Sequence, residues 1–111
     1  MNVLSCMSTY LPMIHIGSSY GAKYLLLRTE NAANEYPIEE VWWINGAEYA
    51  DSAGADIINS SLGYNEFDDV SLSYKANDLN GKTALISRAA SILDSKGIIL
   101  CNSAGNSGSD N

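Results

Sequence analysis

Apolar residues along the first half of the chain fall into patterns that alternate between helix and strand. Residues 1–11 carry an apolar stripe with helical spacing, which predicts a helix that ends before Pro12. Residues 22–28 (AKYLLLR) form a nearly continuous apolar run, which predicts a strand covered on both faces. Residues 38–53 have apolar positions three or four apart and predict a helix, with Pro37 suited to its first turn.

The second half of the chain continues this alternation. Residues 56–59 (DIIN) predict a second buried strand, residues 81–95 predict a helix with one apolar face, and residues 98–101 predict a third strand. Strands that are separated by helical crossovers pair in parallel. The order therefore predicts an α/β fold with three layers, in which a mostly parallel sheet has helices on both of its faces.

Composition and charge exclude several classes of function. The chain has 111 residues, of which 46% are apolar and 17% charged, as expected for one globular domain. The net charge of −7, with six lysines and arginines in total, argues against a nucleic-acid partner, which needs clustered cations. No apolar run reaches the roughly 18 residues of a membrane span, so no membrane partner is expected.

The cysteines and the single histidine give no sign of a metal centre. Cys6 and Cys101 are not part of a CxxC pair, and His15 is the only histidine, so no zinc constellation is present. Both cysteines are expected to be buried free thiols. The acidic loop 65–69 lacks a recognisable calcium-ligand spacing and is expected to be solvated. No metal and no cofactor are predicted.

Small polar residues and glycines follow the second and third predicted strands. The loops are 59–63 (NSSLG) and 102–108 (NSAGNSG). Because the carboxyl ends of parallel strands meet at one edge of a sheet, we expect the two loops to lie side by side. Small side chains would let a peptide approach the backbone closely, so the loops predict a shallow cleft.

The order of these segments resembles the core of the subtilases, the subtilisin-like serine peptidases. IINSSLG follows a helix that ends in ADSAGAD, and KGIILCNSAGN comes later, while YLLLR and WINGAEYA fit the family in the same order. The resemblance covers nearly the whole chain. It implies a partial subtilisin-like fold and a peptide or protein substrate.

The resemblance also implies roles for individual residues. In subtilases the asparagine of the AGN motif donates a side-chain N–H to the oxyanion hole, and Asn106 matches that asparagine. Such a donor stabilises the negative charge that grows on the carbonyl oxygen during attack. The alternative for Asn106 is a turn residue. The residues that match the walls of the substrate cleft are Ser60, Leu62, Gly63, Ser103, Ala104 and Gly105.

The catalytic triad of the family has no match in this sequence. His15 follows the first predicted helix, whereas the subtilase histidine opens it in an HG pair, and Asp51 and Asp56 are at a helix end and a strand start. We therefore expect residues 1–111 to be a single partial domain, an internal piece of a subtilisin-like endopeptidase that works through an acyl-enzyme. The isolated chain is expected to be inactive, and to self-associate through bare strand edges.

Two other functions stay open from the sequence. One is a non-enzymatic, doubly wound module whose loop 102–108 binds an anion or a peptide, although GxGxxG and GxxxxGK[ST] motifs are absent. The other is a pseudo-peptidase that binds peptides without cutting them. The compartment is not decided by the sequence, although enzymes of the resembled family are often secreted.

Overall fold

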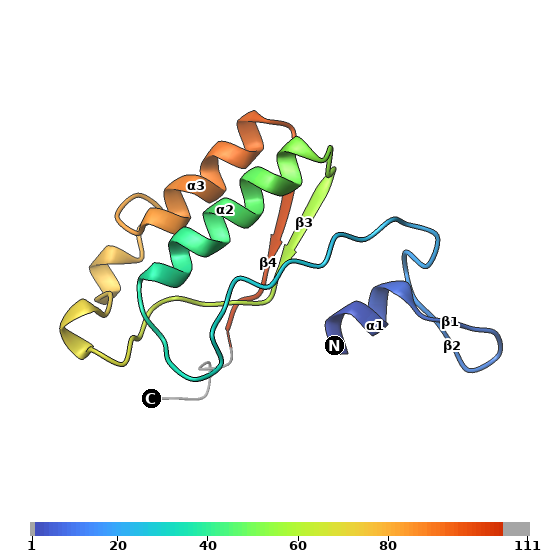
Figure 1. Ribbon diagram of the computed structural model, residues 1–111, viewed down its shortest axis with the longest axis horizontal. Helices are drawn as coiled ribbons and strands as arrows, with labels where there is room; N and C mark the ends of the chain where they lie inside the picture. The colour runs from blue at the N-terminus through green and yellow to red at the C-terminus, as the bar shows by residue number, and fades with distance from the viewer. Residues whose placement is uncertain (1, 106–111) are drawn as a thin grey trace.

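The structure is a computed structural model that describes residues 2–105, and Figure 1 shows the arrangement of its elements. In chain order these are α1 (Asn2–Ser8), β1 (Tyr10–Leu11), β2 (His15–Ile16), α2 (Ile38–Ser52), β3 (Ile57–Ser60), the 3₁₀ turns η1 (Val70–Leu72) and η2 (Ala76–Asp78), α3 (Leu85–Ser95) and β4 (Ile99–Asn102). Among the described residues, no helix has the length and apolar character needed to cross a bilayer.

The core is formed by α2, α3 and the parallel pair β3–β4. Ile57 pairs with Ile99, and the register continues to Ser60 opposite Asn102. The two helices lie side by side along this pair (Figure 1). The buried centre joins Trp43 and Ala47 of α2, Leu93 of α3 and Ile98 just before β4. The predicted parallel pairing of the second and third strands is therefore confirmed.

The helix α2 agrees closely with the helix predicted over 38–53. Pro37 occupies the N-cap position, two glutamates follow in the first turn, and Gly54 beyond the C-cap has a φ of 78°. That left-handed conformation is easy for glycine and ends the helix. A Cβ at Gly46 would stand 3.0 Å from the side chain of Thr29, so glycine at this position lets the preceding segment lie against α2.

The predicted three-layer fold with a mostly parallel sheet is wrong. The described residues form two separate two-stranded sheets, and β1–β2 is antiparallel. Helices cover one face of β3–β4, while Ile57 and Ile99 on the other face are 59% and 62% exposed. Alternate residues of a strand face opposite sides, which explains why Ile58 and Leu100 pack on the core and their neighbours do not.

The predicted strand over 22–28 is also absent. The segment has no regular secondary structure, and Leu25, Leu26 and Leu27 are exposed. An apolar run has side chains suited to a strand, but a strand also needs the backbone of a neighbouring strand for its hydrogen bonds. No described segment pairs with residues 22–28. The expected layer is missing for this reason.

The N-terminal helix is shorter than predicted. α1 ends at Ser8, and β1 and β2 form a hairpin whose turn contains Pro12 and Met13. Cys6 and Cys101 are both exposed, so the prediction of buried thiols is wrong. α1 and the outer face of β4 have no covering layer among the described residues, and this leaves both thiols open to solvent.

Candidate functional site

The structure brings the two predicted loops together where β3 and β4 end. The backbone N–H of Ser103 donates to the carbonyl oxygen of Ser60 over 3.0 Å. The Ser103 hydroxyl lies 3.5 Å from the carbonyl oxygen of Leu62, at the outer limit of a hydrogen bond. The parallel register, which places Ser60 opposite Asn102, produces this juxtaposition.

Ser60 faces the interior of the protein. It is 5% exposed, and its hydroxyl accepts a hydrogen bond of 3.0 Å from the indole N–H of Trp43. Leu62 is half-buried and packs against the core. The side chains of Ser60 and Leu62 therefore anchor their loop, and the backbone is the part of the loop that remains available for a ligand.

The rest of the predicted cleft is open. Gly63, Ser103, Ala104 and Gly105 are exposed, and Gly105 has a φ of 82°. Within residues 2–105, the backbone N–H groups of 61–63, 104 and 105 donate to no other described residue. Free backbone groups on small residues are suited to binding an extended peptide. Asn106, the predicted oxyanion donor, lies outside the described residues.

The residues weighed as triad substitutes lie apart from this edge. His15 in β2 is exposed, and its Nε2 is 3.3 Å from the carbonyl oxygen of Ser5. Asp51 pairs with Lys96 over 3.8 Å, which is the only ion pair in the described part of the chain. Asp56 accepts the backbone N–H of Ile99 through its carbonyl oxygen. His15 has no carboxylate partner among these residues.

A second group of polar side chains gathers at the N-terminal end of α2. Glu39 and Glu40 are each 1% exposed. Glu40 is fully satisfied, because its two oxygens accept hydrogen bonds from the Tyr74 hydroxyl (2.7 Å) and the Ile86 N–H (2.8 Å). Burial, followed by the hydrogen bond to Glu40, raises the pKa of Tyr74 to about 12. Glu40 therefore has a structural role, because it joins α2 to Tyr74 and to the first turn of α3.

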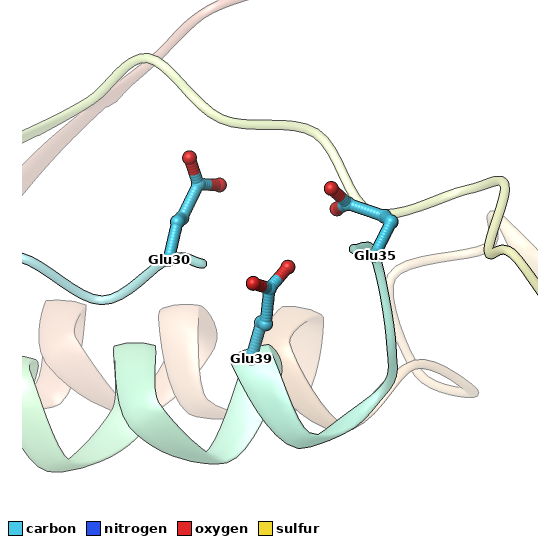
Figure 2. Close-up of side chains that lie close together, drawn as sticks. All are labelled: Glu30, Glu35 and Glu39. Atoms are coloured by element: carbon cyan, nitrogen blue, oxygen red, sulfur yellow. The ribbon is translucent and has the colours of Figure 1, made fainter. Parts of the chain in front are cut away.

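Glu39 has different surroundings. One carboxylate oxygen accepts the backbone N–H of Asn31 over 2.6 Å, and the other is buried without a hydrogen-bond partner. Carboxylate oxygens of Glu30, Glu35 and Glu39 all lie within 4.8 Å of one another, and Figure 2 shows the three side chains converging. Burial, then the negative charges of Glu39 and Glu30, raises the pKa of Glu35.

Sequence reasoning missed this carboxylate cluster. The sequence predicts a helix over 38–53, which contains Glu39, and assigns no site to it or to Glu30 and Glu35. The available signal was the recurrence of glutamate at 30, 35 and 39 across a helix start. Spacing alone does not reveal that Glu39 is buried, because burial depends on how distant segments pack.

No protein-family model, curated protein or solved structure matches the chain. These comparisons therefore give no indication of a subtilase, and function is inferred from geometry and from the residues themselves.

Proposed function

We propose that the chain forms part of the substrate-binding region of a subtilisin-like serine endopeptidase. The observation that carries the proposal is the close approach of the two loops after β3 and β4, joined by the bond from Ser103 N–H to the Ser60 carbonyl oxygen. An extended peptide would bind along this edge through main-chain hydrogen bonds.

The composition of the loops supports binding through backbone. Gly63 has open space around it, since a Cβ built there meets nothing within 4 Å. Glycine at such a position leaves room for another backbone to approach. The N–H groups at 61–63, 104 and 105, which donate to no other described residue, would supply the donors.

Asn106 directly follows this edge in the sequence and would donate its side-chain N–H to the forming oxyanion. An amide donor is neutral and has no proton to lose, so its donation does not depend on pH near neutrality. The nucleophile, the general base and its orienting carboxylate would come from other segments of the parent enzyme. Residues 1–111 would thus bind peptide without hydrolysing it.

The test is an NMR titration of the full chain with an extended casein-derived peptide. We expect chemical-shift changes confined to residues 60–63 and 102–106. Gly63→Ala should weaken binding by about three- to tenfold, as the loss of one backbone hydrogen bond predicts. Gly21→Ala is the matched control, because Gly21 also has nothing within 4 Å of a built Cβ.

The same titration separates the competing functions. Shifts at 102–106 with inorganic phosphate, and none with peptide, would favour an anion-binding module and contradict the peptide-binding proposal. Hydrolysis of the peptide by the pure chain would contradict the assignment of the triad to other segments.

A further inference from the structure

We propose that the carboxylates of Glu30, Glu35 and Glu39 form a binding site for a divalent cation of calcium size at the N-terminal end of α2. The site lies apart from the strand-end loops and does not depend on the peptidase proposal.

The spacing of the three carboxylates fits one calcium ion. Calcium binds oxygen at 2.3–2.6 Å, so two oxygens on opposite sides of one ion stand about 4.6–5.2 Å apart. Three carboxylate oxygens that all lie within 4.8 Å of one another can therefore reach one ion. In Figure 2, Glu30 extends from the segment before α2, Glu35 from the loop that enters it, and Glu39 from its first turn.

Two buried polar groups in the described part of the chain lack a hydrogen-bond partner. Glu39 is 1% exposed, yet one of its oxygens has no partner. The hydroxyl of Tyr64 is likewise buried without a partner, in a residue that is 7% exposed. Buried polar groups almost always have partners, and an unpaired buried charge is strongly destabilising. A cation in the cluster would supply the missing partner of Glu39.

Tyr64 borders the same space from the segment that follows β3. Burial, then the charge of Glu30 and the closeness of the Tyr64 hydroxyl to the Glu30 carboxylate, raises the pKa of Tyr64, while Thr29 acts in the other direction. Its hydroxyl is an oxygen ligand or a donor to a bound water at such a site. A second part of the chain therefore places a buried hydroxyl beside the carboxylates of Glu30 and Glu39.

The neighbouring glutamate provides an internal comparison. Glu40 is as buried as Glu39, and the fold gives each of its oxygens a hydrogen-bond donor. The fold thus satisfies a buried carboxylate that has a structural role. Glu39, whose carboxylate converges with those of Glu30 and Glu35, has a donor on one oxygen only.

Charge points in the same direction. The lone ion pair of the described chain joins Lys96 to Asp51, so no lysine or arginine among residues 2–105 is paired with these carboxylates. The Arg28 guanidinium donates to the carbonyl oxygen of Glu30 and not to its carboxylate. Asp68 adds negative charge nearby, since its carboxylate accepts the backbone N–H of Glu35 over 3.3 Å. The ligand set contains oxygen alone, with no histidine or cysteine, and hard cations such as calcium prefer this set.

The experiment measures thermal unfolding and calorimetric binding of the full chain with CaCl₂ up to 10 mM, against NaCl of equal ionic strength. A partly open site of three carboxylates should have a Kd on the order of 0.1–1 mM. Saturation should then raise Tm by roughly 5–10 °C. Glu39→Gln should abolish the rise, and Glu48→Gln, which removes the same charge from an exposed position of α2, should retain it.

Further variants and ions keep the test decisive. If Glu39→Gln does not fold, Glu30→Gln in the segment before α2 should show the same loss of binding. Terbium, used as a luminescent substitute for calcium, should be sensitised by Tyr64, and Tyr64→Phe should lower that emission. A wild-type chain that binds no calcium, an equal Tm rise in Glu39→Gln, or a larger response to MgCl₂ than to CaCl₂ would each overturn the proposal. A Tm rise on acidification to pH 5, with no response to calcium at pH 7, would also overturn it, because a proton shared between the carboxylates would then replace the proposed cation.

Discussion

The carboxylate of Glu40, in the first turn of α2, accepts a hydrogen bond of 2.8 Å from the backbone N–H of Ile86, in the first turn of α3. The N-cap residue of α3, Ala84, has no side-chain acceptor. A side chain 46 positions earlier in the sequence therefore performs the capping function. This contact fixes α3 relative to α2, and α3 leads directly into β4.

Glu40→Gln should destabilise the protein by about 1–3 kcal/mol. Glutamine can keep its oxygen on the Ile86 N–H and donate its NH₂ group to the Tyr74 hydroxyl, which can accept. Two buried hydrogen bonds to a charged carboxylate therefore become two weaker neutral ones. Urea unfolding followed by circular dichroism measures the change. Glu48→Gln, at an exposed site of the same helix, should change the free energy of unfolding by less than about 0.5 kcal/mol. Equal stability of the two variants would show that the contact between the helices contributes nothing.

Ser60→Ala should cost about 1–3 kcal/mol, because it leaves the buried indole N–H of Trp43 without an acceptor. Ser61→Ala, one residue later and exposed, is the control and should be nearly neutral. Urea unfolding followed by tryptophan fluorescence measures both variants. Since Ser60 offers its carbonyl oxygen and not its side chain at the strand end, peptide binding should change little in folded Ser60→Ala. A large loss of binding with unchanged stability would place the hydroxyl in the cleft instead.

Helices and strands whose signals lie in neighbouring residues were predicted well. The stripe over 38–53 and the glycine at 54 located α2, and the two short apolar runs located β3 and β4 together with their parallel pairing. The helix predicted from residue 81 begins at Leu85 because the Asn80 side chain accepts the backbone N–H groups of Lys82 and Thr83 and holds a turn there. Local side-chain hydrogen bonds thus compete with the helix.

Features that depend on distant partners were not predicted. The run at 22–28 has the composition of a buried strand but no described strand beside it, so the three-layer expectation failed. Glu39 and Glu40 are identical in type and adjacent in sequence, yet only Glu40 receives donors on both oxygens, from Tyr74 and Ile86. No local pattern distinguishes the two residues.

The open face of β3–β4 predicts self-association. Ile57 and Ile99 are exposed on this face, and among residues 2–105 neither strand of the pair has a second strand on its outer edge. Exposed apolar strands pair with other chains, and charged side chains prevent such pairing. Ile99→Lys should raise the dimer dissociation constant at least about tenfold, or about 1.4 kcal/mol. Ser91→Lys on α3 adds the same charge elsewhere and should not. Sedimentation velocity that shows wild type to be monomeric at millimolar concentration would contradict the prediction.

The hydrogen bond from Tyr74 to Glu40 predicts a loss of stability in alkaline solution. Burial and the bond to Glu40 raise the pKa of Tyr74 from about 10 to about 12, so the folded state holds this proton more tightly than the unfolded state. The stabilisation is complete below pH 10 and is lost as the pH rises from 10 through 12. Urea unfolding at pH 9 to 12 should show this loss in wild type, with a smaller slope in Tyr74→Phe. Identical slopes would mean that another tyrosine carries the effect.

Glu35 predicts a loss of stability in the same direction, with rising pH, but at a lower pH than Tyr74 and when no metal is bound. Burial, and then the charges of Glu39, Glu30 and Asp68, raises the pKa of Glu35, so protonation favours the folded state. This contribution is present below the ordinary carboxyl pKa and is lost as the pH rises through the raised value in the folded state. In EDTA at pH 7, Glu35→Gln should therefore be more stable than wild type, and the difference should vanish by about pH 4, near the ordinary pKa of a glutamate.

Glu66→Gln, at an exposed site, controls for the removal of one charge from an acidic protein. Added calcium should reverse the order at pH 7, because wild type gains a ligand that Glu35→Gln has lost. A variant that is less stable than wild type in EDTA would contradict the repulsion among these carboxylates.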